Sequence, residues 1–171
     1  MTTPSAIRAV AALGLVLGIA VAALMVSRWH VAPGSGLTRT SVTMIANNTG
    51  ALAMTPTGAF MRDADISRGP ASGRFVTVNE TGSPLWVRLR LLASSPDLGS
   101  GLVVTAKADG VPIYQGKLSG FAPWTQQRFL IRPGGRAQVE LTVAAAPGAQ
   151  RAIQGRVEQV TVEFGTRPAR S

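Results

Sequence analysis

An uncharged apolar run over residues 9–26 divides this chain into two parts of different character. At about 18 residues, the run is just long enough to cross a bilayer as a helix. A helix there would be apolar on every side, and the rest of the chain is too small to surround it as a soluble core. We therefore expect one N-terminal transmembrane or signal-anchor helix within residues 1–30. Everything after it would then lie outside the cytoplasm.

The residues after the apolar run bear on whether this leader is cleaved. A secretory signal needs a basic start, a short apolar stretch and small residues at the cleavage site. Arg8 supplies the basic start, but Arg28 and Trp29 stand where small residues are needed, and Pro33 would block a cut after Ala32. Arg28 and Trp29 are instead typical of a membrane interface. The sequence favours a retained single-pass anchor in the cell membrane, with a cleaved signal peptide and a secreted protein as the alternative.

Composition excludes several classes of chemistry and partner. The chain has no cysteine, which excludes disulfides, cysteine metal sites and thiol catalysis. Beyond residue 30 there are 15 basic and 8 acidic residues, a net charge of +7. These basic residues are scattered, without a long run or interleaved aromatic residues, so we expect no nucleic-acid partner. An anionic wall polymer or lipid headgroups remain as partners for a basic surface.

From residue 41 onward, short runs rich in Val, Thr, Leu and aromatic residues alternate with Gly, Pro, Asn and Asp. This spacing predicts an all-β fold, an antiparallel, jelly-roll-like β-sandwich over residues 41–166. A polar stalk over 31–40 precedes it, and a tail over 167–171 follows. Strands are predicted at 41–46, 51–54, 74–79, 85–92, 102–107, 111–118, 127–131, 136–144 and 156–164.

Three of these strands alternate regularly between apolar and polar residues, which indicates one buried and one solvated face. The outward residues include Arg88 and Arg90, and also Glu140, Glu158 and Glu163, which we expect to pair with neighbouring arginines. Turns are predicted at 81–84, 108–110 and 133–135, and residues 63–73 are predicted to form a surface loop. The inward positions are Val87, Leu89, Leu91, Ala137, Val139, Leu141, Val143, Val160, Val162 and Phe164.

The order of several short pieces resembles the TasA/camelysin family of exported bacterial proteins. These pieces are NTGALAM at 48–54, VTVNETGS at 76–83, Asp109-Gly110 followed by IYQG at 113–116 and Leu118, IRPGG at 131–135, and Gln154-Gly155. The resemblance implies an exported jelly roll, and members of the family include biofilm-matrix fibre subunits whose N-terminal strand completes a neighbour's sheet. The chain departs from the family after the leader, where GSGLTRT at 34–40 replaces a small-residue, aromatic and Asp motif.

No constellation of catalytic or metal-binding residues is evident. His30 is the only histidine and lies beside the expected membrane edge, so neither a Ser-His-Asp triad nor a zinc-protease site can be assembled in the domain. Asp63 and Asp65 supply too few oxygens for calcium by themselves. Met44, Met54 and Met61 are expected to pack in the core. We therefore predict no enzyme activity, no cofactor and no metal.

Two functional hypotheses remain. The first is a structural or adhesion protein of the cell envelope or extracellular matrix, acting through protein–protein contacts; an extended, unpaired sheet edge near 41–54 would favour it. The second is a membrane-tethered ectodomain that binds a sugar or a wall polymer. The aromatic residues Trp86, Tyr114, Phe121 and Trp124 could form a sugar-binding platform. The candidate contact patch is formed by Tyr114, Phe121 and Trp124, and a groove lined by these residues would favour this hypothesis.

Overall fold

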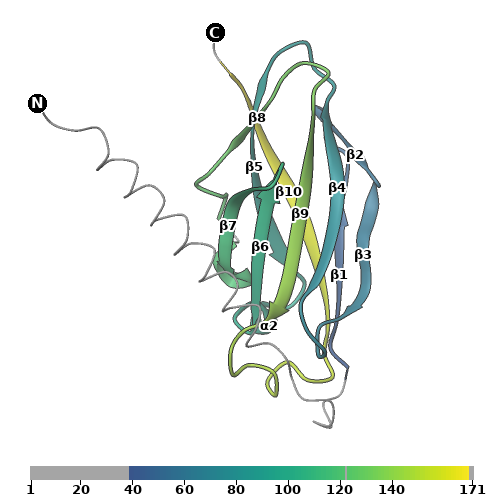
Figure 1. The fold of residues 1–171 in the computed structure, drawn as a ribbon, viewed down its shortest axis with the longest axis vertical. Helices are drawn as coiled ribbons and strands as arrows, with labels where there is room; N and C mark the ends of the chain where they lie inside the picture. Colours follow the sequence, from purple (N-terminus) through teal and green to yellow (C-terminus); the bar gives the residue numbers. More distant parts are fainter. Residues whose placement is uncertain (1–38, 122, 170–171) are drawn as a thin grey trace, which may run out of the picture. The chain divides into compact units, whose positions relative to one another are not determined.

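The computed structural model describes residues 39–121 and 123–169 (Figure 1). The expected leader helix, its interface residues Arg28 and Trp29, and most of the predicted stalk lie outside these residues. Within the described part of the chain, no helix is long and apolar enough to cross a membrane.

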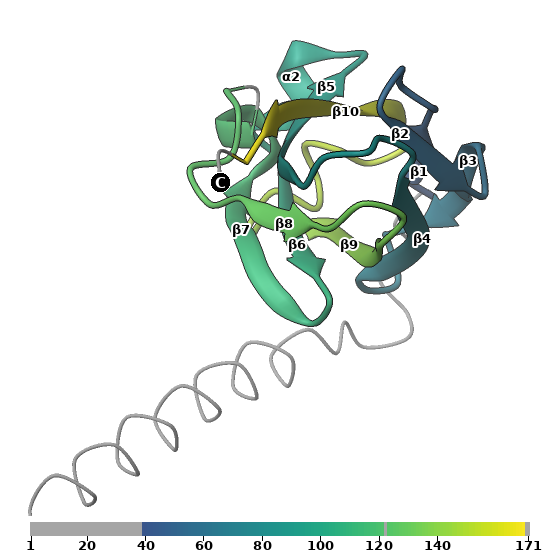
Figure 2. The same cartoon turned by 90° about the horizontal axis from the view of Figure 1, so that it is seen from above.

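The described residues form a β-sandwich of two five-stranded sheets (Figures 1 and 2). This confirms the predicted all-β, two-sheet architecture. A short helix, α2 (Pro96–Gly99), and a 3-10 turn, η1 (Leu118–Phe121), interrupt the strands. The strands are β1 (Ser41–Ala46), β2 (Leu52–Thr55), β3 (Gly58–Asp65), β4 (Ala71–Asn79), β5 (Leu85–Ala93), β6 (Leu102–Ala108), β7 (Val111–Lys117), β8 (Phe129–Ile131), β9 (Arg136–Ala145) and β10 (Val157–Pro168).

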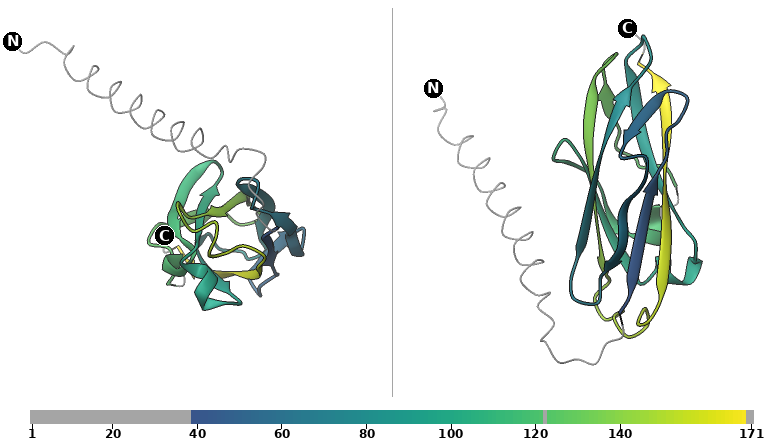
Figure 3. Two further views of the ribbon diagram at one scale, coloured as in Figure 1. Left: turned by 90° about the horizontal axis from the view of Figure 1, so that it is seen from below. Right: turned by 90° about the vertical axis from the view of Figure 1, so that its right-hand side faces the viewer.

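The first sheet has the order β3-β1-β10-β5-β8, and the second has the order β2-β4-β9-β6-β7. All pairings are antiparallel except one: β1 runs parallel to β10, with Ser41 beside Val157 and Ala46 beside Val162. The right-hand view of Figure 3 shows these two strands side by side. The prediction of a wholly antiparallel sandwich is therefore wrong for the pair β1 and β10. Strand β1 inserts between β3 and β10 and runs in the same direction as β10.

The core lies between the two sheets and is built from the residues predicted to face inward. Val87, Leu89 and Val139 have no exposed surface. Phe164 is half-buried and meets Phe75 edge-on, with ring centroids 5.7 Å apart. Met44, Met54 and Met61 are buried in the same cluster, as predicted. Period-2 alternation was therefore a sound guide to the buried face of the regular strands.

Two predicted turns have the backbone that their residues favour. Asp109 and Gly110 both have positive φ, 49° and 80°, and form the two-residue loop of the β6–β7 hairpin. In the second turn, the amide of Gly135 donates to the carbonyl of Arg132 over 2.9 Å, and Gly134 has a φ of 64°. Positive φ is strained for residues with a side chain, so the glycines are required at these places.

Asn79 connects two turns at one end of the sandwich. Its side chain is completely buried, and its amide donates to the carbonyls of Ser83 and Ile131. Its side-chain oxygen accepts from the amide and the hydroxyl of Thr81. One side chain therefore holds the β4–β5 turn and the end of β8 together.

Three expectations need correction. Residues 58–65 form the strand β3, which sequence analysis missed because Asp63, at a φ of 44°, and two register shifts break its alternation. The predicted loop at 63–73 shrinks to 66–70. The last strand continues to Pro168, into the predicted tail, because Arg167 and Pro168 pair with Trp86 and Leu85.

A further correction concerns Glu158, which was expected to face outward and pair with an arginine. It is only 1% exposed. Its Oε1 accepts hydrogen bonds from the amide and hydroxyl of Ser94 and the amide of Ser95. The other two glutamates behave as predicted, since Glu140 pairs with Arg74 and Glu163 pairs with Arg90.

Candidate functional site

The three aromatic residues of the expected contact patch do not form one surface. Phe121 is completely buried, and Tyr114 stacks on it with ring centroids 3.9 Å apart. The Tyr114 hydroxyl donates to the carbonyl of Lys117 over 2.6 Å, and partial burial raises the pKa of this phenol. Tyr114 and Phe121 therefore have a packing role, whereas Trp124 lines a surface pocket to which neither of them contributes.

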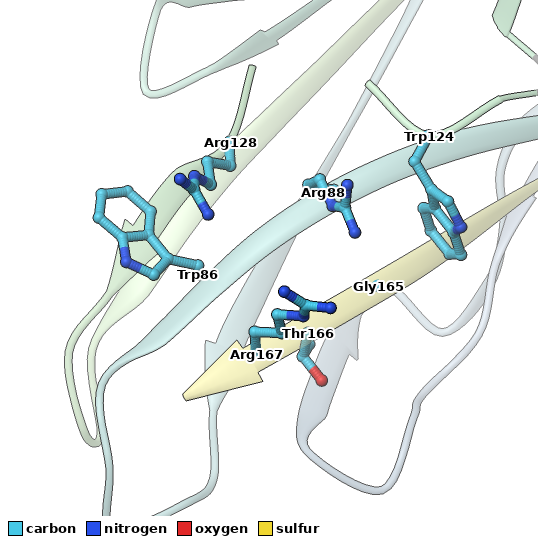
Figure 4. A pocket seen from close by; sticks show the side chains of 7 residues that line it. All are labelled: Trp86, Arg88, Trp124, Arg128, Gly165, Thr166 and Arg167. Carbon is cyan, nitrogen blue, oxygen red and sulfur yellow. The ribbon is translucent and has the colours of Figure 1, made fainter. Parts of the chain in front are cut away.

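That pocket, of about 210 Å³, lies over the face of the first sheet that points away from the core (Figure 4). In the view of Figure 4, the two tryptophans lie on either side, with arginine side chains between them. The lining residues are Trp86, Arg88, Trp124, Arg128, Gly165, Thr166 and Arg167.

Strand register explains why these residues meet. Trp86 and Arg88 alternate with the buried residues of β5, so they share its outer face. On β10, Arg167 lies opposite Trp86, and Gly165 lies opposite Arg88. The segment 123–128, before β8, then brings Trp124 and Arg128 over the same face. The wall is therefore built mainly on two paired strands, which fixes it more firmly than loops would.

Gly165 allows Trp124 to lie directly against β10. A Cβ atom at this position would be only 3.1 Å from Cζ3 and 3.2 Å from Cη2 of the indole ring. The guanidinium of Arg90 covers the Trp124 ring at 4.7 Å from its centre. Arg90 also binds Glu163, with 2.6 Å between Nη2 and Oε2. Trp124 is thus held by both a backbone contact and a cation–π contact.

The pocket is strongly basic. Arg88, Arg128 and Arg167 line it, and none of them is within 4.0 Å of an acidic side chain among the described residues. Arg128 instead lies over the ring of Trp86, 5.2 Å from its centre. The lining includes no carboxylate. The site thus combines three cationic groups with two half-buried indole rings.

Sequence analysis considered Trp86 and Trp124 for a sugar-binding platform, but it grouped them with Tyr114 and Phe121 and missed the arginines as parts of a site. The outward residues Trp86, Arg88 and Arg90 were visible in the alternation of one strand. What could not be seen was that β10 is its neighbour, or that its residues 165 and 167 would lie opposite. Only the register of β5 with β10 assembles the pocket.

The described carboxylates have mostly structural partners. Asp109 accepts from the amide of Gln138 over 2.8 Å, and Asp65 accepts from Ser67. Hydrogen bonding from Ser67 lowers the pKa of Asp65, with Arg68 and Arg39 adding to the effect against partial desolvation. Among the described residues, no group of three or more His, Cys, Asp or Glu side chains is placed to hold a metal ion.

A second candidate site is the N-terminal strand itself. Strand β1 is not the unpaired edge that was considered in the sequence, since β3 and β10 pair with it on both sides. Val42, Met44 and Ala46 have no exposed surface. The amide of Ser41 donates to the carbonyl of Arg156, and the Thr40 hydroxyl donates to the carbonyl of Ile153. A terminal segment thus fills a full position inside the first sheet.

No protein-family model matches the chain, and no curated protein matches its sequence. Among solved structures, it is similar to the P pilus rod subunit PapA, with a TM-score of 0.37 and 10% identity over 60% of this chain and 80% of that one. It is also similar to a family 35 carbohydrate-binding module from an environmental isolate, with a TM-score of 0.32 and 14% identity over 81% and 96%.

A third similar structure is an uncharacterized β-sandwich protein from Clostridium difficile 630, with a TM-score of 0.26 and 8% identity over 77% of this chain and 99% of that one. All three TM-scores are below 0.5, so these similarities carry no argument about this chain. The resemblance to the TasA/camelysin family remains a prediction.

Proposed function

We propose that this chain is a non-catalytic structural or adhesion protein of the cell envelope or extracellular matrix, which assembles with copies of itself through its N-terminal strand. The observation that carries the proposal is the position of β1, a terminal strand inserted parallel to β10 between two other strands. In the proposed assembly, Ser41–Ala46 of one copy occupies this position in the next copy.

Chain topology supports such an exchange. Among the described residues, β1 is the first strand and is joined to the next strand only at its C-terminal end, whereas each of the middle strands is joined at both ends. The connection to β2, residues 47–51, has exposed positions at Asn47, Asn48 and Gly50 and can serve as the hinge. Exchange preserves every contact of β1, because the same residues meet the same partners on another copy.

The energetic cost of leaving the β1 position empty gives the exchange its specificity. Burial of Val42 and of Met44 contributes about 1.5–3 kcal/mol each. An empty position would also leave the facing backbone groups of β3 and β10 without partners. A copy whose own β1 has left therefore favours an incoming strand of the same sequence.

The order of the strands also supports a jelly-roll variant. From β4 to β6, and again from β7 to β10, consecutive strands lie in alternate sheets. Frequent crossing between sheets is typical of jelly rolls. We infer that β1 is an addition to such a core, which is consistent with a strand that can be exchanged.

Single-cysteine variants test the exchange, because the natural chain has no cysteine. Thr43 and Gln159 are register partners on β1 and β10, and neither is buried. A T43C variant and a Q159C variant, mixed during expression or refolding and mildly oxidised, should form a mixed disulfide dimer. The dimer is detected by intact mass, with a T43C/Q159C double variant as the geometric reference.

The matched control pair is L92C with T161C, which are register partners on β5 and β10, two strands that the proposal keeps within one copy. This pair should give no mixed dimer. The proposal is wrong if the T43C/Q159C double variant closes within one chain while the mixed T43C and Q159C variants remain monomeric.

Localisation is tested separately. We propose a single-pass membrane protein with the sandwich outside the cytoplasm, or a secreted protein if the leader is removed. Fractionation of expressing cells, followed by intact mass, distinguishes the two. A full-length species in the membrane fraction supports the anchor, and a species shortened near residues 32–40 in the medium supports secretion.

A further inference from the structure

We propose that the pocket between Trp86 and Trp124 binds an acidic sugar unit, a pyranose ring that carries a carboxylate or phosphate group, within an anionic glycan. This inference is independent of the proposed strand exchange, since the pocket involves neither β1 nor β3.

The lining of the pocket is positively charged. Arg88, Arg128 and Arg167 converge on one pocket, and no acidic side chain among the described residues neutralises them. Like charges held this close repel one another, and a bound anion relieves the repulsion. A guanidinium presents a planar pair of donors that matches the two oxygens of a carboxylate or phosphate. The pocket therefore favours an oxyanion.

Glu163, an acidic residue on the outer face of β10, does not oppose the binding of an anion in the pocket. Glu163 lies two residues before Gly165 on β10, and Arg90 binds its carboxylate over 2.6 Å. Arg90 at the same time covers the Trp124 ring. It thus neutralises a carboxylate that would otherwise repel an incoming anion and fixes one wall of the pocket.

Two indole rings, of Trp86 and Trp124, line the pocket. A pyranose has apolar C–H faces and a polar rim, so it packs against an aromatic wall while its charged substituent reaches a guanidinium. Trp86 and Trp124 are both half-buried, Trp124 lies against β10 at Gly165, and a guanidinium lies over each ring, that of Arg90 over Trp124 and that of Arg128 over Trp86. Tryptophans that insert into a lipid surface would instead project from the sheet. The geometry therefore favours a sugar ring over a lipid surface.

The volume of the pocket limits the size of the ligand that it can hold. A volume of about 210 Å³ is below the roughly 300–1,000 Å³ of pockets that enclose drug-sized molecules. It suits a single ring rather than a nucleotide with several parts. Neighbouring units of a glycan would then extend over the sheet surface beyond the pocket.

Tryptophan fluorescence of the full chain in a nonionic detergent is a direct readout, because Trp86 and Trp124 are two of its three tryptophans. The acidic probes are trigalacturonic acid and glucose 6-phosphate, which distinguish a carboxylate from a phosphate on the ring. The controls are fully methyl-esterified trigalacturonate and glucose, which keep the rings without the charge. Glycerol 3-phosphate represents a lipid headgroup without a sugar ring. We expect saturable quenching by at least one acidic sugar and no saturation with the neutral controls.

Substitutions locate the binding. R88Q and R167Q should each weaken binding of the acidic sugar about tenfold, because each removes a charge-assisted hydrogen bond. R136Q is the matched control: it makes the same change in net charge at an exposed position of β9, on the other sheet, and should bind like the natural chain. Circular dichroism confirms that the variants are folded.

Three results would overturn the proposal. The first is the absence of saturable binding by either acidic sugar. The second is equal weakening by R136Q and R167Q, which would indicate attraction by overall charge. The third is binding of glycerol 3-phosphate as tight as that of the sugars, which would indicate a lipid headgroup site.

Discussion

The carboxylate of Glu158 lies buried beside the turn that leads from β5 into α2. Its Oε1 accepts three hydrogen bonds, at 2.6 and 2.7 Å from the amide and hydroxyl of Ser94 and at 3.1 Å from the amide of Ser95. Its Oε2 has no hydrogen-bond partner among the described residues. This side chain thus fixes a turn at the expense of burying a charge.

We expect the E158A variant to be destabilised by about 3 kcal/mol, because three hydrogen bonds from Ser94 and Ser95 to a buried carboxylate are lost. E158Q retains an acceptor oxygen and should lose about 1 kcal/mol. Urea denaturation followed by tryptophan fluorescence measures both. Equal stability of the two variants would show that these hydrogen bonds are not what holds the turn.

Asp65 gives a prediction of pH dependence. Its Oδ1 accepts from the hydroxyl of Ser67 over 2.5 Å and from the amide over 3.0 Å, and these bonds lower its pKa from the ordinary value of 3.8. A depressed carboxyl pKa in the folded state stabilises the fold above the unfolded pKa, and this contribution is lost as pH falls through the folded pKa.

The S67A variant should therefore raise the pKa of Asp65 towards its ordinary value. Its loss of stability relative to the natural chain should be fully present near neutral pH and should shrink as the pH falls below about 4. Carboxyl carbon shifts followed by NMR give the pKa directly. An unchanged titration midpoint for Asp65 would exclude the hydroxyl as the cause.

At the scale of elements, β1 and the β5–β10 pair carry the functional proposals. Strand β1 closes the first sheet between β3 and β10, and β5 and β10 together display the Trp and Arg residues of the pocket. Because β10 belongs to both arrangements, it links the proposed assembly site and the proposed glycan site within one sheet. The inner residues of β10 serve the core, and its outer residues serve the pocket.

A chain that begins at Asn47 should fail to fold, because it lacks the fully buried Val42, Met44 and Ala46. Their loss removes a large share of the roughly 5–15 kcal/mol that stabilises a domain. A synthetic peptide of residues 38–47, added during refolding, should restore the β-sheet circular dichroism signal. A peptide with Val42→Asp and Met44→Asp is the control and should not restore it. Folding of the shortened chain without any peptide would contradict the importance of β1.

At the scale of the whole molecule, residues 36–171 form one compact unit by their contacts. Its apolar cluster takes residues from both sheets, among them Leu89 and Val160 of the first and Val139 and Leu141 of the second. Neither sheet can bury its inner face without the other. The two sheets should therefore fold and unfold together.

We expect a chain that begins at Gly36 to unfold in one transition, with coincident curves from tryptophan fluorescence and far-ultraviolet circular dichroism. The fluorescence reports Trp86 and Trp124 on the first sheet, and the circular dichroism reports both sheets. Two separated transitions would mean that the sheets are stable independently.

The all-β class, most of the strands and the core face could be predicted from the sequence alone, because alternation and turn residues act over a few neighbouring positions. The β6–β7 hairpin is an example, since Asp109 and Gly110 favour the backbone of its turn wherever the hairpin lies. Tertiary packing sets three other features: β1 runs parallel to β10, Glu158 is buried, and Trp86, Trp124 and Arg167 share a pocket. These features depend on which distant strands become neighbours, and pairing between strands such as β1 and β10, or β5 and β10, is set by the packing of the whole sandwich rather than by any local pattern.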